Sequence, residues 1–251
     1  MIALSLIGIG TGNPDHLTRE AVRAMNDADL ILLPRKGAAK SDLIDLRRAI
    51  CAELLTAPVR VVEFDMPVRD AAVPYLDAVN GWHDAIAGCW RDQIVRHLPQ
   101  GGRLALLVWG DPSLYDSTLR IAQRLGAGGM PITVSVVPGI TSIQMLTAAH
   151  AIPLNGVGEP VLITTGRRLA EQGWPAGAGT VVAMLDGDCA FRTLPPAGLH
   201  IWWGAYLGMA AQALDAGPLT EAGPRIVARR AALRRDHGWI MDIYLLRAAV
   251  P

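Results

Sequence analysis

The chain alternates between continuous apolar runs and segments whose apolar residues recur at helical spacing. The run Ile2 to Ile9 is almost wholly apolar, as expected of a strand buried on both faces of a parallel sheet. Apolar residues then repeat every three or four positions from Leu17 to Ala28, which predicts a helix. Pro74 can open a later, long helix. Further strands are predicted at 30–33, 59–63 and 103–109. Together these elements predict a doubly wound parallel sheet in the N-terminal part.

The C-terminal part is patterned differently. Its predicted strands are separated less regularly by helices, and this favours a mixed sheet. These strands are expected at 132–137, 161–165, 180–185, 199–203 and 239–246. We therefore predict an α/β fold of two α/β domains, 1–115 and 116–251.

Composition narrows the class of protein. The chain is 51% hydrophobic, which is enough for a sizeable core, but its apolar runs are shorter than the roughly 18 to 20 residues of a membrane span. The first residues lack the features of a signal peptide, so we expect a cytoplasmic protein with no membrane partner. Basic and acidic residues balance at 23 each, which argues against a nucleic-acid partner. The cysteines and histidines show no metal-ligand spacing, so no metal is expected.

Three glycine- and proline-containing turns follow three of the predicted strands. They are Ile7-Gly8-Ile9-Gly10-Thr11-Gly12-Asn13-Pro14, Gly110-Asp111-Pro112 and Val136-Val137-Pro138-Gly139-Ile140-Thr141-Ser142. Ligands of open α/β sheets bind outside the carboxyl ends of the strands, so these turns are candidate walls of one site. The first turn does not match the G-x-G-x-x-G pattern of dinucleotide-binding folds, because its glycines fall at 8, 10 and 12.

Each turn has a structural interpretation beside the functional one. The first can be a tight connection or a loop that lets a ligand approach the backbone. Asp111 can accept hydrogen bonds from a ligand or stabilise a turn, since the following proline holds it in an extended conformation. Thr141 and Ser142 can contact a ligand or cap the next helix, and capping is the stronger local interpretation.

The three turns, in this order, resemble those of the tetrapyrrole methylases, the S-adenosylmethionine-dependent enzymes of siroheme and cobalamin synthesis, and the resemblance covers essentially the whole chain. The family pattern V-G-x-G-P-G-D-P corresponds to residues 7–14, with Thr11 in place of proline and Asn13 in place of aspartate. The resemblance implies an active-site cleft between the two domains, a parallel N-terminal sheet and a mixed C-terminal sheet. It also implies S-adenosyl-L-methionine as cofactor, S-adenosyl-L-homocysteine as product, and a homodimer as one assembly open to the chain.

The resemblance carries site residues over motif by motif. The implied cofactor contacts are Thr11, Trp109, Gly110, Asp111, Leu114, Thr141, Ser142, Leu185 and Ala205. Met184 is the alternative to Leu185, because the correspondence slips by one residue there. The catalytic candidates are His16, Asp111 and Tyr115, with Asp15 and Asp186 as further candidates for a base. A histidine titrates near neutral pH, and a tyrosine hydroxyl can donate to an oxyanion.

The implied substrate is a polycarboxylate tetrapyrrole, so basic side chains are expected around it. Arg35, Lys36 and Lys40 lie just beyond a predicted strand end and are the substrate-binding candidates, since arginine pairs bidentately with carboxylates. A second basic group, between Arg225 and Arg235, is interpreted as the solvated face of a helix.

Later segments narrow the resemblance. The stretches 35–43, 202–208 and 237–242 are most similar to the family member that methylates C-1 of precorrin-5 and releases the C-1 acetyl group as acetate. Four alternatives remain open at this point. They are a relative acting at another ring position, an RNA methylase of the same fold, a nicotinamide-dependent oxidoreductase and a non-enzymatic corrinoid carrier.

Overall fold

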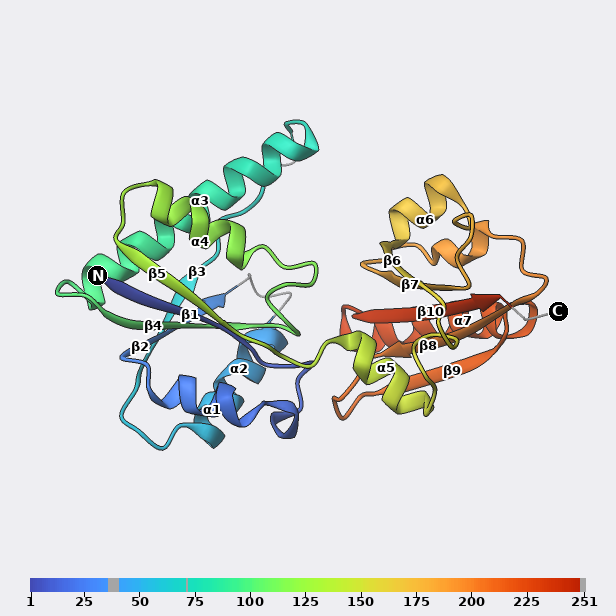
Figure 1. Cartoon of the computed structure of the whole chain (residues 1–251), viewed down its shortest axis with the longest axis horizontal. Helices are drawn as coiled ribbons and strands as arrows, with labels where there is room; N and C mark the ends of the chain where they lie inside the picture. Colours follow the sequence, from blue (N-terminus) through green and yellow to red (C-terminus); the bar gives the residue numbers. More distant parts are fainter. Residues whose placement is uncertain (36–40, 71, 249–251) are drawn as a thin grey trace. The chain divides into compact units, whose positions relative to one another are not determined.

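The protein consists of two compact units, Met1–Ile140 and Thr141–Pro251. The structure is a computed structural model that describes residues 1–35, 41–70 and 72–248. Each unit is built on a five-stranded sheet (Figure 1). None of the helices within the described ranges combines the length and the apolar character needed to cross a membrane.

The first sheet is parallel throughout and has the strand order β3-β2-β4-β1-β5. Its strands are β1 (Ile2–Gly8), β2 (Leu30–Arg35), β3 (Arg60–Asp65), β4 (Gly102–Val108) and β5 (Ile132–Val137). The register places Ile7 opposite both Leu107 and Val137. Strands β1, β4 and β5 therefore end level with one another, so the turns that follow them begin side by side.

Helices cover both faces of this sheet (Figure 1). One face packs on α1 (Arg19–Asn26) and α2 (Ser41–Leu54), and the other packs on α3 (Tyr75–His97) and α4 (Thr118–Ala127). Successive strand residues alternate between the two layers, as the pleat requires. Leu6 points toward α3 and α4, and Ile7 points toward α1 and α2. This double burial explains why the strands read as continuous apolar runs.

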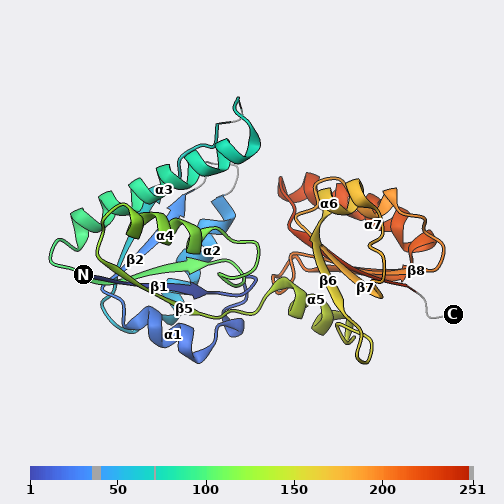
Figure 2. The ribbon, with the colours of Figure 1, turned by 45° about the horizontal axis from the view of Figure 1, so that its top comes forward.

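The second sheet is mixed, with the order β6-β7-β10-β8-β9. Its strands are β6 (Val161–Thr165), β7 (Thr180–Met184), β8 (Leu199–Ala205), β9 (Ala213–Pro218) and β10 (Asp242–Ala248). Only β6 and β7 are parallel neighbours. Helices α6 (Gly166–Gln172) and α7 (Leu219–His237) cover one face, and α5 (Ser142–His150) covers the other (Figure 2).

The predicted parallel and mixed sheets are both confirmed. The division of the chain differs from the predicted one, because it falls after Ile140 rather than after Tyr115. Strand β5 belongs to the first sheet, where Ile132 pairs with Ile2. A pairing between residues so far apart in the sequence leaves no local pattern, so residues 132–137 were expected in the C-terminal domain. Strand β2 also continues through Pro34 to Arg35, beyond its predicted end.

Candidate functional site

The first two glycine turns are joined directly by their backbones. Gly10 N–H donates to the Gly110 carbonyl at 3.3 Å, and Gly110 N–H donates to the Gly10 carbonyl at 2.8 Å. These bonds form an isolated antiparallel bridge beyond the ends of β1 and β4. Both glycines have positive φ, 70° and 66°, a conformation that L side chains rarely adopt. The sequence therefore needs glycine at these two positions to close the bridge.

The third turn packs against the first two so closely that side chains are excluded. A Cβ on Gly139 would lie 2.1 Å from the Gly110 carbonyl oxygen, and a Cβ on Gly8 would lie 2.6 Å from the Gly139 nitrogen. The clashing atoms are backbone atoms, so no rotamer change would relieve them. The predicted grouping of the three turns at one edge of the sheet is therefore a feature of the first unit itself.

Asp111 holds the second and third turns together. Its Oδ2 accepts a hydrogen bond of 2.9 Å from the Gly139 N–H, and its Oδ1 accepts bonds from the Ser113 N–H and hydroxyl. Burial acts to raise the pKa of Asp111, but the Ser113 hydroxyl and the backbone N–H groups of Gly139 and Ser113 outweigh it. The pKa of the carboxyl therefore lies below its ordinary value, and both oxygens are already engaged by the protein.

Two buried polar atoms, one in the first turn and one just after it, have no hydrogen-bond partner in the described part of the chain. They are Thr11 Oγ1 and His16 Nδ1. Thr11 is 3% exposed, and His16 ends the short helix η1 (Pro14–His16). The His16 Cβ lies 3.3 Å from the position that a Cβ on Gly10 would take, so the imidazole packs beside the glycine bridge. Buried polar groups are normally satisfied, and these two therefore point to a ligand.

The tautomer of His16 follows from its neighbour Asn13. The Asn13 Oδ1 accepts the Asp15 N–H at 3.0 Å, and this bond fixes the orientation of the amide. The amide nitrogen Nδ2 then faces His16 Nε2 at 3.4 Å. In the neutral ring, Nε2 is therefore the acceptor, and the proton resides on Nδ1. The unpartnered Nδ1 is thus a hydrogen-bond donor.

The remaining predicted residues of the first unit lie just before and just after the second turn. Trp109 is half-buried between β4 and Gly110. Leu114 N–H donates to the Asp111 carbonyl at 3.3 Å, which closes the turn. Tyr115 is 44% exposed and has a positive φ of 49°, which is uncommon for a bulky residue. Such outliers occur often at functional sites.

In the second unit, Thr141 and Ser142 begin helix α5. Thr141 is the N-cap, and with Gln144 it forms a capping box, in which its hydroxyl accepts the Ile143 N–H at 3.2 Å. The Gln144 side chain accepts the Thr141 N–H at 3.0 Å. Capping, the stronger local interpretation, is therefore what the structure contains. The capping box leaves the Thr141 hydroxyl little hydrogen-bonding capacity for a ligand.

Leu185 and Ala205 follow or end two strands of the second sheet. Leu185 comes directly after β7 with a positive φ of 53°, and its side chain is 66% exposed. Ala205 is fully buried at the end of β8, so only its backbone could reach a ligand. An exposed, large apolar side chain on a positive-φ residue is uncommon, and such outliers cluster at functional sites, so Leu185 remains a site candidate.

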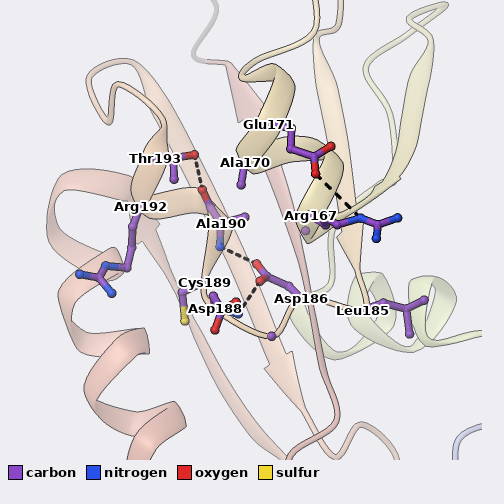
Figure 3. A pocket seen from close by; sticks show the side chains of 12 residues that line it. Arg167, Ala170, Glu171, Leu185, Asp186, Asp188, Cys189, Ala190, Arg192 and Thr193 are labelled. Carbon is purple, nitrogen blue, oxygen red and sulfur yellow. Dashed lines mark hydrogen bonds and ion pairs between the residues drawn. The ribbon is translucent and has the colours of Figure 1, made fainter. Parts of the chain in front are cut away.

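A pocket of about 620 Å³ lies beside Leu185 (Figure 3). Helix α6, the loop 185–189 and the short helix η3 (Ala190–Thr193) line it. Asp186 shapes the loop, because its carboxylate accepts the N–H groups of Asp188 at 2.9 Å and Ala190 at 2.6 Å. Tyr244 donates its hydroxyl to the same carboxylate at 2.7 Å. Desolvation raises the Tyr244 pKa, and the Asp186 charge adds to the effect.

Arg230, on helix α7, donates hydrogen bonds to the same loop, a contact that the sequence did not predict. It is 8% exposed and forms an ion pair with Asp242 at 2.8 Å. Its two amino groups donate to the carbonyls of Gly187 at 2.9 Å and Asp186 at 2.7 Å. The arginine cluster was expected to be a solvated helix face, and for Arg230 that expectation is wrong. The sequence of α7 alone does not indicate that Arg230 lies beside the backbone carbonyls of the loop 185–189.

The predicted substrate-binding residues are only partly described. Arg35 ends β2 and pairs bidentately with Asp65, with both N···O distances at 2.9 Å, and Glu63 lies 3.7 Å away. Lys36 and Lys40 lie outside the described residues. Among the residues that are described, no group of three or more His, Cys, Asp or Glu side chains could hold a metal ion.

The first unit thus presents a close-packed cluster of glycine turns at the strand ends, with two unsatisfied polar atoms beside it. The N–H and C=O groups of Gly10 and Gly110 bond to each other, so Thr11 Oγ1 and His16 Nδ1 are the groups that a ligand would satisfy in the described part of the chain. The Thr11 hydroxyl fits S-adenosyl-L-methionine, whose ribose and amino-acid groups both donate and accept hydrogen bonds. The His16 Nδ1–H fits an acceptor oxygen.

Comparisons with known proteins cover nearly the whole chain. A model of the tetrapyrrole (corrin/porphyrin) methylases matches residues 3–223. The chain is 48% identical over 250 residues to a precorrin-6A synthase (deacetylating) from a Sinorhizobium species, and the match covers 98% of this chain and 95% of that protein. It is 30% identical over 174 residues to a precorrin-2 C(20)-methyltransferase from Sinorhizobium, covering 66% of this chain and 65% of that one.

Solved structures agree with the sequence comparisons. A cobalamin-synthesis-related protein (CobF) from Corynebacterium diphtheriae superposes with a TM-score of 0.85 at 38% identity, covering 100% of both chains. A uroporphyrin-III C-methyltransferase from Thermus thermophilus, solved with S-adenosyl homocysteine, has a TM-score of 0.57 at 18% identity, covering 98% of this chain and 92% of that one. At 18% identity, the similarity to the Thermus thermophilus protein shows a shared fold alone.

Proposed function

Because the chain belongs to the tetrapyrrole (corrin/porphyrin) methylases, we propose that it methylates C-1 of precorrin-5 and releases the C-1 acetyl group as acetate, as a precorrin-6A synthase (deacetylating) does. The observation that carries the proposal is the 48% identity over 98% of the chain to a relative of that name. The close packing of the glycine turns in the first unit supports it, since these turns contain the motifs that resemble the family.

The cofactor contacts are proposed on both units. In the first unit they are Thr11, Trp109, Gly110, Asp111 and Leu114, and in the second they are Thr141, Ser142, Leu185 and Ala205. When bound, S-adenosyl-L-methionine supplies an electrophilic methyl group and leaves as S-adenosyl-L-homocysteine. The protein mainly aligns the two reactants, a contribution that can reach ~7 to 11 kcal/mol.

His16 is proposed to act on the acetyl group. Loss of acetate requires water to add to the acetyl carbonyl and the bond to C-1 to break, so that acetate leaves and C-1 keeps the electron pair of that bond. Negative charge develops on the carbonyl oxygen as water attacks, and a preorganised donor stabilises it. The His16 Nδ1–H, buried and without a protein acceptor, is suited to that donation. We therefore assign His16 as an electrophilic donor rather than as the base.

Tyr115 and Asp111 are proposed to have different roles in the reaction. The Tyr115 hydroxyl is on an exposed, positive-φ residue beside the second turn and is proposed as a second donor to the acetyl oxygen. Asp111 was considered as a catalytic group, but its oxygens accept from Gly139 and Ser113. We assign it a positioning role, in which it fixes the spacing of the turns. Arg35, Lys36 and Lys40 are proposed to attract the carboxylates of the macrocycle.

The reaction is tested by anaerobic incubation of the protein with methyl-labelled S-adenosyl-L-methionine and precorrin-5. We expect one labelled methyl group in the tetrapyrrole and one acetate released per turnover. Methylated product without acetate would contradict the proposed reaction and favour another ring position. No labelled product, together with no binding of S-adenosyl-L-methionine, would favour a corrinoid carrier.

The role of His16 is tested in the same assay with His16→Ala. We expect acetate release to slow by 10²-fold or more, the order found when one oxyanion donor is removed. Affinity for S-adenosyl-L-homocysteine should change little. Glu20→Gln is the matched control, because Glu20 is exposed, lies in the first turn of the following helix α1 and has no proposed role. Unchanged acetate release in His16→Ala would exclude the role.

Cofactor binding is followed through tryptophan fluorescence. We expect S-adenosyl-L-homocysteine to quench emission of the wild-type protein and to quench the Trp109→Phe variant much less. Equal quenching in both proteins would remove Trp109 from the proposed contacts.

A further inference from the structure

Arg47 is a buried cation at the edge of the first sheet where the glycine turns lie. It belongs to α2 and is 9% exposed. Its Nε donates to the Leu107 carbonyl at 3.0 Å, and its Nη1 donates to the Leu43 carbonyl at 3.0 Å. Leu107 stands two residues before Trp109. The guanidinium therefore reaches from the helix toward the carboxyl end of β4.

The bond to Leu107 has a structural explanation in Pro34. Where β1 pairs with β4, Gly8 lies opposite Val108, and the next residue, Ile9, donates to the Val108 carbonyl at 2.9 Å. On the other side of β4, the β2 register places Leu32 opposite Leu106. Continued by one residue, this register places Leu33 opposite Leu107. The next residue along β2, Pro34, would then have to donate to the Leu107 carbonyl, but proline has no N–H. Arg47 Nε supplies the missing donor.

The hydrogen bond to the Leu107 carbonyl requires one N–H donor and does not require a charge. The Nε2 atom of a glutamine is separated from Cα by the same number of bonds as the Nε atom of an arginine, so glutamine could satisfy Leu107. None of the ion pairs in the described residues includes Arg47. The second amino group, Nη2, also has no acceptor among those residues. A buried charge without a partner is costly.

The electrostatic surroundings of Arg47 agree with an anion-binding role. Burial lowers the pKa of Arg47 to about 10, and Asp116 opposes this shift only from beyond ion-pair distance. The Asp116 carboxylate itself accepts the N–H and the hydroxyl of Thr118. Arg47 nevertheless remains protonated at neutral pH. A desolvated guanidinium of this kind binds a carboxylate more strongly than a solvated one does.

We propose that Arg47 binds a carboxylate of a ligand through the part of its guanidinium that the protein leaves unpaired. The inference rests on the proposed function for the identity of that ligand. Two sources of carboxylate are available, an acidic side chain of the tetrapyrrole and the amino-acid end of the cofactor. Arg47 is thus a binding residue that adds to the predicted set of Arg35, Lys36 and Lys40.

The test compares Arg47→Gln with Arg48→Gln and the wild type. The first variant keeps a donor for Leu107 and removes the charge. The second removes a neighbouring exposed arginine that pairs with Glu63 and Asp45. Calorimetry measures the Kd of S-adenosyl-L-homocysteine and of uroporphyrin III, a stable polycarboxylate tetrapyrrole. The KM for precorrin-5 is measured in the methyl-transfer assay.

We expect Arg47→Gln to weaken one of the two ligands by roughly ten- to a hundredfold, the range for a hydrogen bond to a charged group, and Arg48→Gln to weaken neither. Weaker uroporphyrin III binding, with a raised KM for precorrin-5, assigns the carboxylate to the tetrapyrrole. Weaker S-adenosyl-L-homocysteine binding assigns it to the cofactor. Arg47→Lys, which keeps the charge, should retain most of the affinity and separates loss of charge from a folding defect.

Three results would overturn the proposal. They are wild-type affinity of Arg47→Gln for both ligands, an equal loss in Arg48→Gln, and a wild-type protein that binds neither ligand. Failure of the proposed function is a separate result, since it would appear as absent methyl transfer to precorrin-5 in the wild type while the binding measurements still decide the role of Arg47.

Discussion

Asp111 and Gly139 are joined by a hydrogen bond of 2.9 Å, in which the Gly139 N–H donates to the carboxylate Oδ2. They lie 28 positions apart, in the turns after β4 and β5. These strands are not neighbours, because β1 lies between them. The bond therefore spans the end of β1, where Gly8 leaves no space for a side chain. The bond fixes the distance between the turns that follow β4 and β5, and we call it the Asp111–Gly139 brace.

Asp111→Asn should break this brace. An asparagine presents an NH₂ group where one carboxylate oxygen now accepts, so it faces either Gly139 or Ser113 with a second donor. We expect the free energy of unfolding, measured by urea denaturation, to fall by about 1 to 3 kcal/mol. The Kd of S-adenosyl-L-homocysteine should rise at the same time, because the turns lose their spacing.

The pH dependence gives this substitution a second readout. The folded pKa of Asp111 lies below its ordinary value, so its stabilisation is present above the unfolded pKa and is lost as pH falls through the folded pKa. Asp111→Asn should therefore lose less stability than the wild type on acidification. Ser113→Ala is the control, since it removes one donor and leaves the Gly139 bond. A fully stable Asp111→Asn variant would contradict the brace.

Gly139→Ala tests the close approach of the turns. The new Cβ would lie 2.1 Å from the Gly110 carbonyl oxygen, and only a backbone shift could relieve that contact. We expect a loss of stability of about 3 kcal/mol or more, at the upper end for overpacking, measured by thermal and urea unfolding.

Gly81→Ala is the matched control. Gly81 lies inside α3, and a Cβ there would meet nothing within 4 Å. Alanine is favoured over glycine in helix interiors, so this variant should gain roughly 0.5 to 1 kcal/mol. Similar losses in both variants would mean that glycine replacement, not turn packing, sets the cost.

The order of the three turns made the first half of the site predictable, because each turn follows an apolar run that reads as a strand. The backbone bridge of Gly10 and Gly110 and the absence of space at Gly139 are consistent with that prediction. The capping role of Thr141 also follows from local sequence, since the helix begins at the next residue.

Other features depend on partners distant in the sequence and could not be predicted locally. Strand β5 joins the first sheet only because Ile132 pairs with Ile2. Strand β9 lacks β-branched and aromatic residues and ends in Gly217-Pro218, so nothing in its composition indicates a strand. Arg230 is buried because Asp242 and two loop carbonyls compensate its charge, and these arrive from β10 and from the loop after β7.

Tyr244→Phe should loosen the loop that presents Leu185. The substitution removes the hydroxyl that donates to Asp186 at 2.7 Å and keeps the ring, which packs edge-to-face on Phe191. We expect a stability loss of about 0.5 to 1.5 kcal/mol, the usual worth of one hydrogen bond, with a severalfold higher Kd for S-adenosyl-L-homocysteine. A stability loss with unchanged Kd would remove Leu185 from the proposed cofactor contacts.

His83 should make the protein less stable at mildly acidic pH. It lies on α3, is 4% exposed, and its Nε2 has no hydrogen-bond partner in the described part of the chain. Burial lowers its pKa, the cations of Arg124 and Arg120 lower it further, and Asp84 and Asp116 oppose the shift. The unfolded chain therefore takes up a proton near pH 6.5, where the folded protein does not.

Stability is thus lost as pH falls from about 6.5 toward the folded pKa, with a slope of at most about 1.4 kcal/mol per pH unit for one proton. His83→Gln cannot take up this proton, so its unfolding free energy should fall less steeply between about pH 7 and 5. Urea denaturation at several pH values measures both slopes, and comparison at pH 8, where the wild-type imidazole is neutral in both states, isolates any packing cost. Parallel curves for the two proteins would show that His83 carries no part of the acid sensitivity.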